Sequence, residues 1–280
     1  MSEVLSPDKI LDATSDISVK KANGSFKKLF ILAILAGAFI AFAAQGSTLA
    51  GMNLMSNPET FGIGKVVTGL IFTPGIVFVI IAGAELFTGN SLMLVGVFDK
   101  KVKVSQLLRA WVIVYLGNFV GSIIVAFLVI KSGQLDSVNN LLAQRTILTA
   151  NSKVNLSFSH AFVLGILCNW LVCLGVWMSF GSSSHMGKIF SVALPIMLFV
   201  ISGFEHSVAN MYYIPAGILA KANPEYLNSL LQGANIAKDA LANLTWSGFF
   251  VKNLIPVTLG NIVGGGLFEA AAYWLALRRK

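Results

Sequence analysis

Four acidic or histidine residues lie inside long apolar stretches of the sequence, beyond the first few residues of each stretch, where they could bind or move charge. They are Glu85, Glu205, His206 and Glu269. A charged side chain at the centre of a bilayer costs about 2.5–3.5 kcal/mol on insertion scales, so ionisable residues at that depth face a cavity or a partner. If these stretches cross a membrane, the four residues are the first candidates for a functional site.

His206 is the residue best suited to chemistry with a small anion. An unperturbed imidazole, with a pKa of about 6.5, can exchange a proton near neutral pH or donate a hydrogen bond. The sequence around Glu85 matches that around Glu205 but has Leu86 in the place of His206, so symmetric packing does not explain the histidine. We expect Thr88 to be its hydroxyl partner across a pore. The alternative is a neutral structural histidine bonded to a neighbour.

Two pairs of segments repeat along the chain. Residues 83–90 read GAELFTGN and residues 203–210 read GFEHSVAN, while residues 116–121 read LGNFVG and residues 259–264 read LGNIVG. The repeats divide the chain into two halves of three spans each. Because three is odd, the second half has the opposite orientation to the first, which is the inverted-repeat plan with broken helices at a central site. Non-helical backbone at membrane depth persists only where protein or a wet cavity satisfies it. The alternative is that these Gly and Asn residues only help helices to pack.

The two glutamates of the repeated segments occupy equivalent places. We expect Glu85 and Glu205 to brace the broken helices by accepting hydrogen bonds from backbone amides that the breaks set free. This bracing role is favoured over proton transfer. Glu269 lies near the end of the last apolar stretch, and we expect it to be structural.

Six apolar spans would position these residues. The 280-residue chain is 56% hydrophobic and 11% charged, with a mean hydropathy of +0.78, which is typical of a membrane protein. One crossing needs roughly 20 apolar helical residues. The sequence predicts an all-α polytopic membrane protein with six transmembrane helices, of which the second and fifth are broken. The expected spans are 30–55, 63–84 with a tail to 98, 107–130, 158–180, 189–219 and 249–277.

The distribution of charge predicts the topology. Residues 1–26 lack the order of a cleavable signal, and we expect them to form an amphipathic surface segment before one channel domain at 27–280. With spans on alternating sides, thirteen of the 20 Lys and Arg residues fall on the side of the two termini. Because positive charge is enriched in cytoplasmic loops, both termini are expected in the cytoplasm.

Several other classes of protein fit the sequence less well. The net charge of +8 comes from short clusters between apolar spans, so no nucleic-acid partner is expected. Cys168 and Cys173 have no metal-ligand spacing around them, and no cofactor or metal is expected. An enzyme would need a catalytic pair or metal cluster at membrane depth. A water channel of the aquaporin class should carry intramembrane Asn-Pro motifs, whereas residues 57–58 and 223–224 lie in polar connections.

The chain resembles the formate/nitrite transporter family. The resemblance covers roughly residues 25–274 and is carried by GFEHSVANM at 203–211, GAELFT at 83–88, CNWLVC at 168–173 and NLIPVTLGN at 253–261. It implies an aquaporin-like fold, a homopentamer with one pore per protomer, and a place in the bacterial cytoplasmic (inner) membrane. It also implies transport of a small monovalent anion, first formate and then nitrite. A hydrosulfide or lactate permease of the same family and an aquaporin-like neutral-solute channel are the alternatives.

The resemblance also implies roles for individual residues. It makes His206 the central pore histidine and Thr88 its hydroxyl neighbour. Apolar constrictions are implied at Phe72, Ile76, Leu86 and Phe199, pore-wall positions at Asn169 and Asn261, and a basic vestibule residue at Lys153.

These roles suggest a mechanism. A bare anion cannot cross a dry apolar ring cheaply, because an unpaired charge in low dielectric costs many kcal/mol. We therefore expect Lys153 to gather the anion, and His206 with Thr88 to bind it and supply a proton, so that a neutral acid passes. The competing hypothesis keeps the anion charged, stabilised by helix N-termini and the same two side chains.

Overall fold

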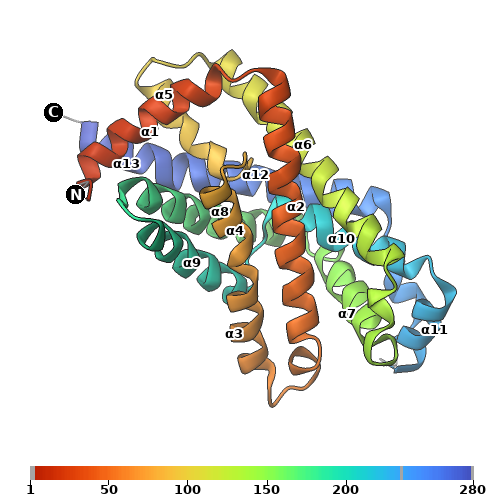
Figure 1. Cartoon of the computed structure of the whole chain (residues 1–280). Helices are drawn as coiled ribbons and strands as arrows, with labels where there is room; N and C mark the ends of the chain where they lie inside the picture. Colours follow the sequence, from red (N-terminus) through yellow and green to blue (C-terminus); the bar gives the residue numbers. More distant parts are fainter. Residues whose placement is uncertain (1–3, 234–235, 279–280) are drawn as a thin grey trace.

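Six helical spans form the body of the protein (Figure 1). The computed structural model describes residues 4–233 and 236–278, and helices make up the regular structure of these residues. Each span is long and apolar enough to cross a membrane, which confirms the predicted fold class. The spans are Phe26–Gly51, Phe61–Ala82, Val104–Lys131, Phe158–Gly181, His185–Ser202 and Gly248–Arg278.

The second span is broken, as predicted. It is built from α3 (Phe61–Phe72) and α4 (Pro74–Ala82), which meet at a proline that cannot continue the backbone hydrogen bonding. The chain then leaves the helix at Gly83 with φ +81° and resumes in η2 (Gly89–Met93) and α5 (Leu94–Phe98). This left-handed conformation costs a side-chain-bearing residue roughly 1–2 kcal/mol, so glycine is the natural residue there.

The fifth span is broken in the same way. α9 (His185–Ser202) ends at Gly203, whose φ is +74°, and α10 (Ser207–Lys221) begins after a short non-helical segment. The span predicted for this region therefore consists of two helices. Residues 203–206 lie at their junction, where backbone groups are left without intrahelical partners.

The other spans are the uninterrupted helices α2 (Phe26–Gly51), α6 (Val104–Lys131) and α8 (Phe158–Gly181), together with a composite last span. The last span consists of η5 (Gly248–Leu254), α12 (Ile255–Val263), η6 (Gly264–Ala271) and α13 (Ala272–Arg278). Shorter elements lie in the connections: η1 (Leu54–Ser56), η3 (Gln134–Asp136), α7 (Ser137–Val154), α11 (Pro224–Gly233) and η4 (Lys238–Leu241).

The N-terminal helix α1 (Pro7–Ala22) covers the end of the bundle at which both termini lie (Figure 1). It packs on α5, α8 and α13. Arg278 of α13 forms an ion pair with Asp12 of α1 at 2.8 Å and another with Asp99, after α5, at 3.0 Å. The helices α1 and α13 are therefore held together at the same end of the bundle.

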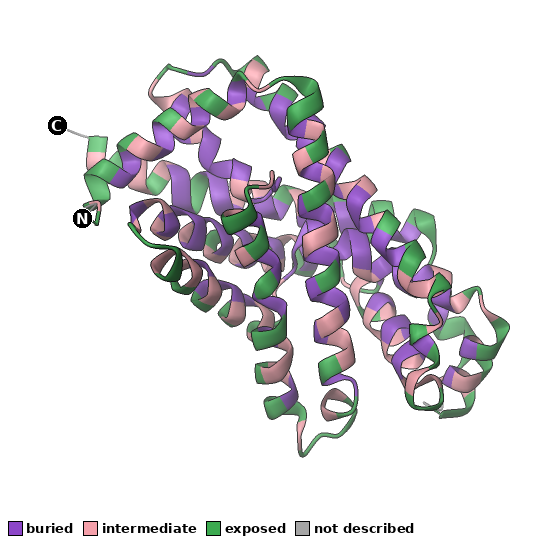
Figure 2. Cartoon of the chain, in the orientation of Figure 1, coloured by how far each residue is buried: buried purple, intermediate pink, exposed green. Residues whose placement is uncertain are grey.

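Buried and exposed residues alternate along most of the helices (Figure 2). Large apolar side chains occur in both groups, in the interior and on the outer surface. The interior is closely packed, and at the crossing of α2 and α6 a Cβ on Gly37 or Gly121 would collide with the backbone of the facing helix. Large exposed side chains such as Phe190 and Leu194 face outward. Such a surface suits lipid, because helices in a bilayer associate through small residues and not through hydrophobic burial.

Candidate functional site

Two asparagines hold the broken segments in place. The side-chain oxygen of Asn118 accepts from the backbone N–H of Phe87 at 2.9 Å, and that of Asn261 accepts from Ser207 at 2.9 Å. Each amide nitrogen also donates to the carbonyl of the break glutamate, Glu85 or Glu205, at 2.9 Å. Each break thus has the same hydrogen bonds, and a buried asparagine replaces the partners that the helix has lost.

Each break glutamate is bound to a lysine and an asparagine. Glu85 accepts from Lys21 at 2.8 Å and from Asn90 at 3.0 Å. Glu205 makes the corresponding contacts in the other half of the chain, to Lys153 at 2.7 Å and to Asn210 at 2.7 Å, with Asn253 as a further donor at 3.3 Å. We expected backbone donors, but Asn118 and Asn261 already take the freed amides. The carboxylates instead fix the flanking helices through side-chain contacts.

Thr88 and His206 meet between the two breaks. Thr88 Oγ1 lies 2.9 Å from His206 Nε2, and both side chains are buried. His206 Nδ1 accepts from the backbone N–H of Ala209 at 3.0 Å, so the ring caps the N-terminus of α10. A ring nitrogen that accepts carries no hydrogen, so a neutral ring carries its hydrogen on Nε2 and donates it to Thr88. The hydroxyl hydrogen of Thr88 is then left for a third group.

Apolar side chains surround this polar pair. The rings of Phe72 and Phe199 are in edge contact, with centroids 5.8 Å apart, and Phe199 stacks on His206 at 5.9 Å. Ile76 is 2% exposed and Leu86 is 3% exposed. The four residues expected to form constrictions therefore lie in the interior, in the two broken spans that carry Thr88 and His206.

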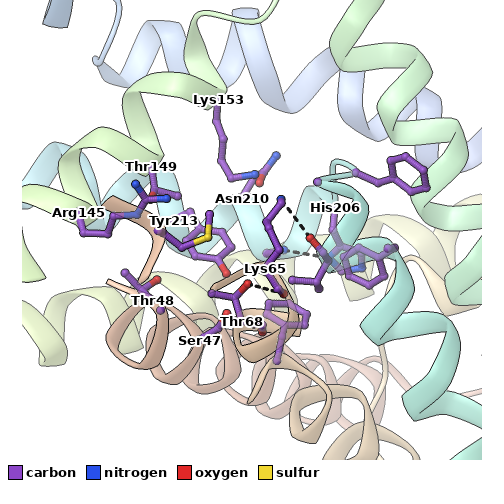
Figure 3. Close-up of a pocket in the computed structure, with 18 residues that line it drawn as sticks. Ser47, Thr48, Lys65, Thr68, Arg145, Thr149, Lys153, His206, Asn210 and Tyr213 are labelled. Atoms are coloured by element: carbon purple, nitrogen blue, oxygen red, sulfur yellow. Dashed lines mark hydrogen bonds between the residues drawn. The ribbon is translucent and has the colours of Figure 1, made fainter. Parts of the chain in front are cut away.

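Two cavities approach the pair. The first, which we name the Lys153 cavity, has a volume of about 150 Å³ and is lined by Lys153, His206, Phe72 and Phe199 among others (Figure 3). The second, the Lys21 cavity, has a volume of about 70 Å³, and its lining includes Lys21, Asn90, Ile76 and Leu86. The lining residues of the two cavities do not overlap. Each cavity thus has one lysine bound to a break glutamate and a pair of apolar residues.

Asn169 and Asn261, which were expected on the pore wall, are fully buried and line neither the Lys153 cavity nor the Lys21 cavity. Asn261 uses its side chain on the second break, as described above. Asn169 donates to the carbonyl of Thr88 at 3.2 Å and to that of Asn261 at 2.6 Å, and its side-chain oxygen has no hydrogen-bond partner in the described residues. The structure therefore brings Asn169 close to the Thr88 backbone, with an oxygen still available.

Glu269 lies apart from both cavities. It is 1% exposed in η6 and lines neither the Lys153 cavity nor the Lys21 cavity. Its Oε1 has no hydrogen-bond partner among the residues that the structure describes.

Three residues of the site were not expected from the sequence. Lys21 belongs to the N-terminal segment that was expected at the surface, and Arg145 and Thr149 lie between the third and fourth predicted spans. The structure places Lys21 on Glu85, and Arg145 and Thr149 in the Lys153 cavity. The four-residue spacing of Arg145, Thr149 and Lys153 could have indicated one helix face.

Comparison with known proteins gives matches along almost the whole chain. Residues 8–275 match the model of the family described as formate/nitrite transporter. The formate channel FocA of Escherichia coli (strain K12) is 38% identical over 280 residues, covering 99% of this chain and 96% of that protein. The formate channel FocA of Haemophilus influenzae is 41% identical over 268 residues, covering 95% and 92% respectively. A solved pentameric formate channel with formate bound superposes with a TM-score of 0.80 at 38% identity, covering 91% of this chain and 98% of that chain.

Proposed function

Because the chain belongs to the formate/nitrite transporter family, we propose that it conducts small monovalent anions across a membrane, with formate first and nitrite next. Curated relatives that match nearly its full length are named formate channels. They are described as channels and not as enzymes. The similar solved structure is a pentamer with formate bound, which supports a homopentamer with the anion as its substrate.

The Thr88–His206 contact is the observation that carries this proposal. The pair lies in the apolar interior, and the two flanking cavities each contain a lysine. A lysine in a cavity raises the local concentration of anions. The hydroxyl hydrogen of Thr88 can then donate to an anion that arrives from either cavity. In this proposal Lys153 and Lys21 gather the ion, and Thr88 with His206 binds it.

Passage through the apolar residues requires the anion to lose its charge or its water. We propose that a proton joins the bound anion at Thr88 and His206, and that the neutral acid passes Phe72, Phe199 or their counterparts Ile76 and Leu86. The proton is taken up from solution on the entry side, is passed to the anion by His206, and is released with the anion on the other side. Neutralisation removes most of the penalty for an unpaired charge in low dielectric.

The contacts of the histidine set a condition on this step. A doubly protonated ring would carry a hydrogen on Nδ1, directed at the N–H of Ala209, and would lose the helix cap. Loss of such a cap costs about 0.5–2 kcal/mol. Protonation of His206 is therefore transient in this proposal and is favoured only while an anion is next to the ring. If the anion stays charged throughout, the cap is never released.

The proposed topology is an inverted repeat in the cytoplasmic membrane of a bacterium, with both termini in the cytoplasm. It is supported by the matching hydrogen bonds at the two breaks and by the location of α1 and α13 at one end. The excess of Lys and Arg on the side of the termini supports the orientation. The Lys153 cavity is then the outer vestibule, and residues 1–26 lie at the cytoplasmic mouth.

Proteoliposomes that contain a pH-sensitive dye test the proposal. We expect pulses of formate or nitrite to produce flux in vesicles with the wild-type protein but not in empty vesicles. Thr88→Val should abolish most of this flux, whereas Thr88→Ser, which keeps the hydroxyl, should retain it. Wild-type vesicles that pass neither anion would overturn the proposal, and an active hydrosulfide or lactate flux would redirect it within the family.

A further inference from the structure

One face of α7 carries three hydrogen-bond donors into the Lys153 cavity. Arg145, Thr149 and Lys153 are spaced four residues apart, so they follow one another along the helix. Figure 3 shows Arg145 and Thr149 on the side of the cavity away from His206, and Lys65 between these two residues and the histidine. One helix thus supplies three donors to the cavity that His206 also lines.

Lys153 and Arg145 differ in whether an acidic partner neutralises their charge. Lys153 is bound to Glu205 at 2.7 Å. Arg145 is half-buried, lines the same cavity, and has no hydrogen-bond or ion-pair partner among the residues that the structure describes. The hydroxyl of Thr149, one turn away, is likewise without a partner in that part of the chain. A guanidinium that is partly withdrawn from water and unpaired favours a bound anion.

The surrounding charges strengthen this preference. The cavity lining contains Lys65, Arg145 and Lys153, and the described residues contribute no Asp or Glu to it. The nearby Glu205 is already engaged by Lys153. Lys65 makes a long contact, 3.5 Å, to the carbonyl of Val200 and lies 6.0 Å from the centroid of the Phe61 ring, so it has no acidic partner among the described residues. Two of the three cations are therefore free to act on a ligand.

We propose that Arg145 and Thr149 form an outer capture subsite for planar anions with two oxygen atoms, namely formate, nitrite and other small carboxylates. The guanidinium fork matches two oxygens at once, whereas a lysine acts as a point charge. Hydrosulfide has one heavy atom and cannot use the fork. This inference rests on the proposed transport function, because it assigns a selective entry step to the same pathway. Arg145 binds the anion first, and Lys153 and His206 receive it.

Flux measurements on three variants test the subsite. Arg145→Gln should raise the half-saturating concentration of formate and nitrite roughly threefold to tenfold, with little change in maximal flux, since a charged bidentate contact is lost. Arg145→Lys keeps the positive charge but loses the guanidinium fork. In this variant the half-saturating concentration should return to the wild-type value for hydrosulfide but not for formate. Lys238 is an exposed cation outside the cavity. Lys238→Gln removes the same charge and should leave the half-saturating concentrations of formate and hydrosulfide unchanged. Equal shifts in Arg145→Gln and Lys238→Gln, or full rescue of formate by Arg145→Lys, would overturn the proposal.

A binding measurement separates this inference from the transport function. Saturation-transfer NMR of ¹³C-formate on purified protein reports binding without flux. Binding that weakens in Arg145→Gln supports the subsite even if wild-type vesicles prove inactive, an outcome that would defeat only the proposed function. Binding that is unchanged in Arg145→Gln, beside active wild-type flux, would defeat only the subsite.

Discussion

Thr88 Oγ1 lies 2.9 Å from His206 Nε2, although the two residues are 118 positions apart in the chain. The contact joins the break of the second span to the break of the fifth. Because Ala209 occupies the other ring nitrogen, the neutral histidine can only donate to Thr88, and Thr88 can only donate onward. The two side chains therefore act as one hydrogen-bonding unit.

The asparagines that satisfy the breaks should be essential for stability. Asn118→Ala or Asn261→Ala leaves the buried backbone N–H of Phe87 or Ser207 without a partner and removes a donor from two carbonyls, so we expect each change to lower the free energy of unfolding by about 2 kcal/mol or more. Thermal unfolding in detergent measures the change. Asn228→Ala, at an exposed position in α11, is the control and should be neutral. Equal melting temperatures for all three variants would contradict the bracing role.

The pair of Lys153 and Glu205 should show strong coupling. Their side chains are 15% and 6% exposed, so removing one partner leaves a largely buried charge, at a cost of about 3–5 kcal/mol. We expect Lys153→Met to be much more destabilising than Lys153→Met combined with Glu205→Gln. A double-mutant cycle of unfolding free energies measures the coupling. Additive effects would show that the contact does not hold α7 to the break.

Glycine should be required at both helix ends that precede the breaks. Gly83 and Gly203 have φ values of +81° and +74°, so Ala at either position should cost about 1–2 kcal/mol in backbone strain. Gly62, in the first turn of α3, lacks a positive φ, and a Cβ at this position would meet only open space. Gly62→Ala should therefore be neutral or stabilising by up to about 1 kcal/mol. Thermal unfolding of the three variants measures these effects. A Gly203→Ala variant as stable as the wild type would contradict the requirement for glycine at this position.

The contact of Asp99 with the C-terminal helix should be sensitive to acid. Burial alone would raise the pKa of Asp99, but hydrogen bonds from Arg278 and Trp274 lower it below its usual value. A depressed carboxyl pKa contributes stability above the unfolded value of about 3.9, and this contribution is lost as the pH falls through the folded value. We therefore expect α13 to loosen below about pH 4.

Hydrogen exchange of α13 between pH 3 and pH 7 measures this loosening. In Asp99→Asn, the backbone amides of α13 should exchange faster than in the wild type at pH 7. Most of the difference in α13 protection between pH 3 and pH 7 should be lost. Asp8→Asn, near the start of α1, removes an acidic group outside the described ion pairs and should behave as the wild type. An unchanged pH dependence in Asp99→Asn would contradict the assignment.

Much of the fold could be predicted from the sequence because hydropathy and repetition report on it directly. Gly, Glu and Asn at matching offsets located both breaks. The second repeated pair of segments contains Asn118 and Asn261, but Asn261 was expected on a pore wall and Asn118 was given no role. The bracing donors were predicted incorrectly, because sequence cannot show that an asparagine from another helix reaches the freed amide first. The side chains of Asn118 and Asn261 reach the breaks from other helices, and a local sequence pattern does not report such contacts.

The remaining site residues depend on long-range packing. Lys21 and Lys153 make the same contact but lie at different sequence distances from their glutamates, 64 and 52 residues. Their equivalence could therefore not be read from spacing. α7 lies outside the six predicted spans, yet it packs along α10 and brings Arg145 and Thr149 into the Lys153 cavity.

The central claim is that Thr88 and His206 bind the anion and provide its proton. The most direct test is formate uptake with simultaneous proton movement at pH 5 to 8, in wild type and His206→Asn. Asparagine can still cap α10, because it is a strong N-cap residue, but it cannot titrate. We predict that wild-type flux rises as the pH falls, with protons entering beside formate, and that the variant loses this acid dependence. An unchanged pH profile and unchanged proton movement in His206→Asn would contradict the claim and leave the histidine a structural cap.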